Sequence, residues 1–140
     1  MKKVKVVAPG EGEFISRPET GGAATLKLTG ADTDGGLTVW TSRREVGDVR
    51  GPATHVHDFD EVFFVLAGEY AFTVEGSEAI AGKGGLVFVP GGVEHSFQSS
   101  GKLPGELLSM GMPAGIEEFF RAQAAGRSTD NVVRFVKQGD

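Results

Sequence analysis

Short apolar segments separated by glycine-containing turns run through most of this chain, and they restrict its fold more than any other feature. Glycine accounts for 22 of the 140 residues, against an average share of about 7%. Tight turns accept glycine more readily than any other residue, and short apolar segments bounded by such turns are typical of β-strands. Their regular spacing favours an all-β sandwich or barrel over βαβ units.

The expected strands follow from runs and alternations of apolar residues. The segment 61–67 is almost wholly apolar, which predicts a strand buried on both faces. Residues 9–22 are rich in turn formers and are expected to cross the surface, anchored by Phe14 and Ile15. The predicted strands are 4–8, 24–29, 37–46, 61–67, 70–75, 77–80, 86–89, 95–98 and 106–112, with 132–136 as a further candidate.

One helix is predicted near the end of the chain, over residues 116–125. Ile116, Phe119, Phe120 and Ala124 share one face at helical spacing. Two glutamates occupy the first turn, where the helix dipole favours negative charge, and a glycine follows the last turn. We expect the phenylalanines to pack on the barrel or on a neighbouring subunit. The alternative is that this helix covers the barrel mouth as part of a substrate gate.

Composition excludes several classes of partner. The formal net charge is −5 and the pI is about 5.2, and no Lys or Arg run exceeds two residues, so neither nucleic acid nor an anionic membrane is expected as a partner. The chain has no cysteine, which excludes disulfides and thiolate ligands. No apolar run long enough for a signal peptide or membrane span follows the basic start. We therefore expect a cytoplasmic protein.

All three histidines of the chain belong to one constellation with a glutamate. His55 and His57 are two residues apart, which places them on the same face of a strand. Glu61 follows in an apolar run, where a carboxylate is costly unless it is paired or binds metal. Together with His95, these residues predict a divalent metal site with one or two open coordination positions. The alternative is a pair of surface histidines beside a solvated glutamate.

The spacing of this constellation resembles the two motifs of the cupin superfamily. The first reads His55-x-His57-x3-Glu61-x6-Gly68, and the second reads Gly84-x5-Pro90-x-Gly92-x2-His95. The resemblance covers residues 51–99. Two positions depart from it: Val49 stands where the family usually has glycine, and Ser99 where it usually has asparagine. Neither position ligates metal in the family, so the departures affect the expected turn geometry and leave the site intact.

The length of 140 residues predicts a single domain over residues 1–140. The resemblance implies that this domain is a jelly-roll β-barrel with a metal inside near one mouth. It also implies that the metal ligands are His55, His57, Glu61 and His95. The expected cofactor is one divalent first-row transition metal, and mixed imidazole and carboxylate ligation suits Fe, Mn, Co, Ni, Cu or Zn. By strand parity and residue type, the expected substrate pocket is lined by Trp40, Phe63, Val65, Phe72 and Phe97.

Within the superfamily, the segment 113–121 is similar to a Phe-Phe helix of the small quercetinase-type cupins. This similarity favours a dioxygenase that acts on an aromatic or enolic small molecule, with dioxygen as co-substrate. Glu61 is the only base that the sequence offers near the metal, so it is expected to act in catalysis as well.

Two alternatives stay open: a metal-dependent isomerase, decarboxylase or lyase of a small carboxylate or sugar, and a non-catalytic small-molecule-binding cupin. We also expect a homodimer, because jelly-roll barrels leave sheet edges that pair between subunits. Residues 4–8 and the C-terminal segment are the expected exchange elements.

Overall fold

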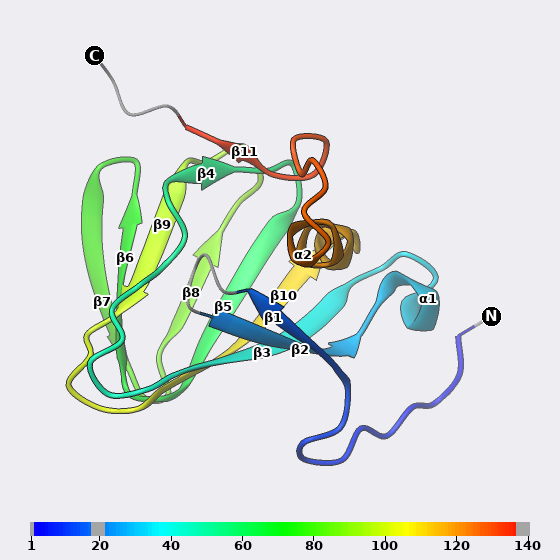
Figure 1. Ribbon diagram of the computed structural model, residues 1–140, viewed down its shortest axis with the longest axis horizontal. Coiled ribbons are helices and arrows are strands. Elements are labelled where there is room, and N and C mark those ends of the chain that lie inside the picture. The colour runs from blue at the N-terminus through cyan, green and yellow to red at the C-terminus, as the bar shows by residue number, and fades with distance from the viewer. Residues whose placement is uncertain (1, 18–21, 137–140) are drawn as a thin grey trace.

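Two antiparallel β-sheets face each other, and one helix packs against the larger of them (Figure 1). The computed structural model describes residues 2–17 and 22–136. The six-stranded sheet has the order β1 (Glu13–Arg17), β2 (Gly22–Leu28), β3 (Thr38–Arg44), β10 (Gly105–Met112), β5 (Asp60–Ala67) and β8 (Leu86–Val89). The five-stranded sheet has the order β11 (Arg134–Phe135), β4 (His55–Val56), β9 (His95–Ser99), β6 (Glu69–Val74) and β7 (Ser77–Gly82). The helices are α1 (Gly30–Thr33) and α2 (Ile116–Ala124).

Alternation between buried and partly exposed residues explains why the strands of the larger sheet form. Along β10 every second residue is buried, and this strand lies between β3 and β5. The same alternation holds along β5, where Glu61, Phe63 and Val65 are buried and the residues between them are not. The prediction that this strand is buried on both faces is therefore wrong. Its apolar outward residues, Val62 and Phe64, lie on the outer face of the sheet.

Most of the predicted strands are present, and the differences lie at the N-terminal end. Residues 4–8 form no strand in the described part of the chain, and Val4 and Val6 are 96% and 86% exposed. The segment 13–17, which was expected to be a loop, forms β1 and pairs with β2. Ile15 is 6% exposed and anchors β1, whereas Phe14 points outward. Residues 4–8 have the apolar composition of a strand but no partner strand among the described residues, so the prediction of a strand there is wrong.

Helix α2 begins at the predicted residue and ends one residue earlier than expected. Its apolar face packs on the inner face of β1 to β3, where Ile116, Phe119 and Phe120 join Ile15 and Trp40 in one buried cluster. The rings of Trp40 and Phe120 meet edge to face, with centroids 5.4 Å apart. A second buried cluster fills the space between the two sheets. The expectation that the helix packs on the barrel is confirmed.

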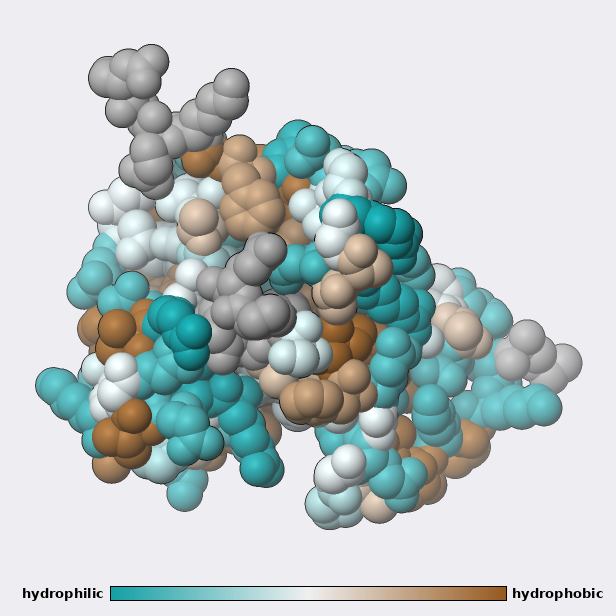
Figure 2. Space-filling model, in the orientation of Figure 1, coloured by the Kyte–Doolittle hydropathy of each residue, from teal (hydrophilic) through white to brown (hydrophobic). Residues whose placement is uncertain are grey.

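On the face shown in Figure 2, hydrophilic residues predominate and hydrophobic ones form separate spots. No helix among the described residues is both long enough and apolar enough to cross a membrane.

Candidate metal centre

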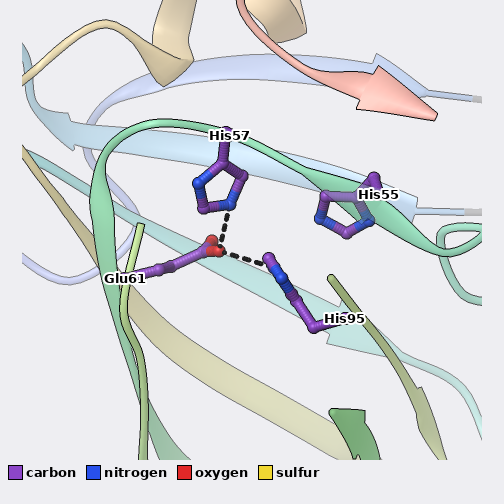
Figure 3. Close-up of side chains that lie close together, drawn as sticks. All are labelled: His55, His57, Glu61 and His95. Atoms are coloured by element: carbon purple, nitrogen blue, oxygen red, sulfur yellow. Dashed lines mark hydrogen bonds and ion pairs between the residues drawn. The ribbon is translucent and has the colours of Figure 1, made fainter. Parts of the chain in front are cut away.

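The four predicted residues converge on one point inside the barrel (Figure 3). His55 lies on β4 and His95 begins β9, and these two residues are directly paired across the strands. His57 follows β4, and Glu61 is the second residue of β5. All four are buried, with exposed fractions between 0% and 7%, and one potential ligand atom from each lies within 4.8 Å of the others. The surface-histidine alternative is therefore wrong.

Backbone carbonyls orient all three imidazoles. His55 Nδ1 lies 2.8 Å from the carbonyl of Ala53, and His95 Nδ1 lies 2.8 Å from the carbonyl of Val93. His57 Nδ1 lies 3.0 Å from the carbonyl of Phe59, whose own ring stacks on the imidazole at 3.7 Å. A carbonyl oxygen only accepts, so each Nδ1 must donate and the neutral ring presents a bare Nε2. This is the tautomer that a metal ion requires.

The carboxylate of Glu61 brings a fourth lone pair to the same point. Its Oε1 lies 2.9 Å from His57 Nε2 and 3.2 Å from His95 Nε2. When the imidazoles are neutral, acceptors face acceptors at these distances, so either a shared proton or a cation must lie between them. Burial opposes ionisation of Glu61. When His57 and His95 carry a proton on Nε2, their hydrogen bonds and charge outweigh burial and lower the pKa of this carboxyl. The geometry thus fits a positively charged occupant.

His55 is held in the neutral form that ligation needs. Burial, followed by repulsion from His95, lowers the pKa of His55 from 6.5 to about 4. At neutral pH its Nε2 therefore carries a lone pair. A buried neutral imidazole beside an ionised carboxylate is the donor set that divalent first-row metals prefer.

A turn of proline and two glycines ties the two halves of the centre together. Gly92 N donates to the carbonyl of His57 at 2.8 Å, and Gly91 N donates to Asp60 Oδ1 at 2.8 Å. A Cβ on Gly91 would lie 2.1 Å from the carbonyl oxygen of Asp58, so no other residue fits there. Asp60 therefore fixes this turn and contacts no imidazole, since the three Nδ1 atoms all face backbone carbonyls.

A cavity adjoins the centre, and His55, His57 and Glu61 form part of its wall. Its volume is about 50 Å³, below the roughly 300–1,000 Å³ of pockets that hold drug-sized ligands. Helix α2 closes one side of it, and Phe135 of β11 closes another. The apolar part of the wall consists of Trp40, Pro52, Phe97, Ile116, Phe119, Phe120, Val133 and Phe135.

Only two of the five residues that were expected to line the pocket do so. Trp40 and Phe97 lie in the cavity wall. Phe63, Val65 and Phe72 do not, which corrects the expectation from strand parity: they are 0% to 1% exposed and pack in the cluster between the sheets. Parity identifies the inner face of a strand, but these three lie farther along their strands, where inward side chains of both sheets meet and leave no space.

Sequence reasoning missed the residues that helix α2 and the C-terminal segment contribute to the wall, and it missed the polar end of the cavity. Arg44 lies four residues after Trp40 on β3, so both side chains are on the same face of this strand. This parity was a usable signal, because an arginine on the inner face of a barrel strand is unusual enough to indicate a ligand site.

Comparison with known families agrees with this geometry. A family model described as "Cupin domain" matches residues 41–111, just over half of the chain. The chain belongs to the cupin family. The jelly-roll barrel inferred from the motifs is the architecture of this family, and the observed pair of antiparallel sheets confirms the predicted fold class.

Several solved structures resemble this cupin. A polyketide cyclase, RemF, from Streptomyces resistomycificus has a TM-score of 0.72 and 15% identity over 99% of this chain and 89% of its own. An RmlC-like cupin from Shewanella frigidimarina has a TM-score of 0.67 and 19% identity over 84% of this chain and 99% of its own. A predicted oxalate decarboxylase from Thermotoga maritima has a TM-score of 0.67 and 21% identity over 78% of this chain and 99% of its own. At these identities the likeness shows the shared fold alone. No curated protein matches this cupin.

Proposed function

We propose that this cupin is a metal-dependent dioxygenase that acts on an aromatic or enolic small molecule such as a flavonol or catechol. His55, His57, Glu61 and His95 would hold one divalent first-row metal ion. The observation that carries the proposal is the convergence of three bare Nε2 atoms and one carboxylate beside a cavity with an aromatic wall. A metal in this centre supplies Lewis acidity and, when redox-active, a binding place for dioxygen.

Glu61 is the residue to which we assign proton transfer. Among the described residues that line the cavity, it is the only carboxylate. Its lowered pKa keeps it ionised at neutral pH, so it can accept the proton of a substrate hydroxyl and leave an anionic oxygen facing the centre.

The cavity wall favours a flat, apolar substrate body. Trp40, Phe97, Phe119 and Phe120 present rings to the same space, and aromatic side chains stack on or meet the edges of aromatic ligands. A flavonol does not fit the cavity at its present volume, so we assign α2 and the β11 segment the role of a cover that shifts when substrate enters. Helix α2 would then act as the substrate gate that the sequence offers as an alternative.

The test is oxygen consumption by protein loaded separately with Fe, Mn, Co and Ni, in the presence of flavonols and catechols. We expect consumption with at least one pair of metal and substrate. Glu61→Gln keeps the shape of the side chain but removes the base, so kcat should fall about 100-fold or more. Metal content measured on the same samples separates this effect from loss of the ion. If no tested combination of metal and substrate leads to oxygen consumption, the dioxygenase assignment is contradicted.

A second candidate is a metal-dependent isomerase, decarboxylase or lyase of a small carboxylate. The observation that favours it is the presence of Arg44 and Arg50 in the cavity wall, because arginine binds carboxylates with two parallel hydrogen bonds. Product analysis under nitrogen distinguishes the two, since only this second class turns over without dioxygen.

We also propose that the protein is a homodimer. The outer face of β8, β5 and β10 carries paired apolar residues, with Phe88 opposite Val62 and Leu86 opposite Phe64. Phe88 is 54% exposed and Leu86 is 61% exposed, and β8 is an edge strand. A second copy on this face would bury both. The C-terminal segment is a weaker candidate for exchange, since β11 pairs with β4 of its own chain.

A further inference from the structure

The end of the cavity farthest from the histidines is polar. Trp40, Ser42 and Arg44 alternate along the inner face of β3, so the wall changes from aromatic to cationic within one strand. Tyr70 of β6 reaches the same end from the opposite sheet. Its hydroxyl lies against the backbone of Gly105, where an added Cβ would come within 2.6 Å of the Oη atom. Gly105 is paired with Arg44 across β10 and β3, which places the two polar groups together.

One guanidinium nitrogen of Arg44 and the hydroxyl of Tyr70 are buried without a hydrogen-bond partner in the described part of the chain. Among the described residues, three buried side-chain polar atoms have no hydrogen-bond partner, and two of them are Arg44 Nη1 and Tyr70 Oη. The Arg44 side chain is 8% exposed and Tyr70 is 2% exposed. An unpaired buried donor costs about 1–3 kcal/mol, and more when it is charged. Two such donors that line one end of a cavity indicate a ligand that accepts from both.

The charges around this end leave it positive. Asp48 Oδ2 lies 3.5 Å from Arg44 Nη1, close enough for an ion pair but without a hydrogen bond. The same carboxylate accepts hydrogen bonds from Arg50 Nε at 3.0 Å and from Arg50 Nη2 at 3.1 Å. One carboxylate therefore serves two guanidinium groups. Glu106 is occupied by Arg43 on the outer face of the sheet. One positive charge is left to face the cavity.

We propose that Arg44 and Tyr70 form a carboxylate-binding subsite, so that the aromatic or enolic substrate of this cupin also carries a carboxylate, which lies at this end. That another oxygen of this substrate faces the metal centre rests on the proposed function. Along β9, His95 is opposite Val74 and Ser99 is opposite Tyr70, a separation of four residues or about 13 Å. An acid that spans both ends has an apolar body between its carboxylate and the oxygen that faces the metal.

The phenol of Tyr70 is suited to donate. Burial raises the pKa of Tyr70 to about 12, although Arg44 opposes this shift. The hydroxyl therefore stays protonated at every pH at which the protein is assayed. A guanidinium and a neutral phenol are both donors, so this end selects an anion with acceptor oxygens over a cation or a neutral amide.

The experiment is calorimetric titration with two carboxylates of different size, propionate and benzoate, each compared with its amide. We expect the metal-loaded protein to bind at least one acid about tenfold to hundredfold more tightly than its amide, as charge-assisted hydrogen bonds imply. Arg44→Met should abolish this preference, and Tyr70→Phe should reduce it several-fold. Lys83→Met is the control: this exposed cation lies in the turn between β7 and β8 and takes no part in the cavity wall, and the preference should be unchanged.

Repeating the titrations after metal removal separates this inference from the proposed function. A preference for the acid that survives metal removal and is lost in Arg44→Met supports the subsite, even if the metal chemistry proves different. A preference that disappears with the metal shows that the carboxylate binds the ion, which overturns the subsite and leaves the metal centre standing. Two further results would overturn the subsite. One is equal binding of acid and amide to the wild type. The other is an unchanged preference for the acid in both Tyr70→Phe and folded Arg44→Met.

Discussion

At the scale of single residues, backbone carbonyls decide which nitrogen each imidazole presents in the centre. Because all three Nδ1 atoms are occupied, removing one ring removes one Nε2 that no neighbour can replace. We expect His57→Ala to lower the affinity for Co(II) or Zn(II) at least about 100-fold, measured by titration against a competing chelator. Asp58→Ala is the matched control, since this neighbour has a side chain 90% exposed. Wild-type affinity in His57→Ala would contradict the assignment of His57 as a ligand.

The lowered pKa of His55 also makes the metal-free protein sensitive to acid. The folded-state value is about 4, against 6.5 in the unfolded chain, so the unfolded chain takes up a proton first as pH falls. The stabilisation is present above pH 6.5 and is lost progressively down to pH 4, by about 3 kcal/mol in total. Urea unfolding of the metal-free protein at pH 7, 5.5 and 4.5 measures this loss. In His55→Gln the loss should be smaller by that amount, and an identical pH dependence in both proteins would refute the effect.

At the scale of elements, the attachment of α2 depends on a buried glutamate in its first turn. Glu117 is 5% exposed and accepts hydrogen bonds from Gly115 N at 2.7 Å, Gly30 N at 2.7 Å and Thr38 Oγ1 at 2.6 Å. Despite burial, these bonds keep the pKa of Glu117 below its usual value. One carboxylate thus fixes the start of α2 to β3 and to the turn at α1.

Glu117→Ala leaves these donors without a partner and should lower the free energy of unfolding by about 3 kcal/mol. It should also loosen the cover of the cavity. Glu118→Ala is the control: its carboxylate forms an exposed pair with Arg121 at 3.0 Å, which is worth less than about 1 kcal/mol. Urea unfolding of the two variants measures the difference. Equal losses would show that Glu117 does not hold the helix in place.

Sequence reasoning succeeded where the information is local. The four residues of the centre follow from spacing along the chain, and β10 and β5 follow from apolar patterning. It failed where a partner decides the outcome: β1 forms because β2 is beside it, and the apolar residues 4–8 have no such neighbour in the described chain. Trp40 and Phe97 of the cavity wall were predicted, but the residues that α2 and β11 contribute were not, since these elements meet the barrel only through tertiary packing.

At the scale of the whole molecule, the outer face of the larger sheet exposes apolar side chains on three neighbouring strands. On this face, outward apolar side chains form two rows across the strands β8, β5 and β10. Phe88, Val62 and Met110 form one row, and Leu86, Phe64 and Leu108 form the other. All of these residues alternate with the buried positions of their strands, so they point outward. A contiguous apolar sheet face of this kind indicates a protein interface.

We expect a dimer at micromolar concentration in sedimentation equilibrium, with this face buried between the subunits. Phe88→Glu places a charge in the contact and should weaken the dimer at least 100-fold, because a desolvated and unpaired carboxylate costs several kcal/mol. Leu103→Glu is the control, since Leu103 is equally exposed at 59% but lies in a loop outside the face. A monomeric wild type, or a Phe88→Glu variant that stays dimeric, would show that this face is not the interface. Metal content should be the same in monomer and dimer, because all four ligands come from one chain.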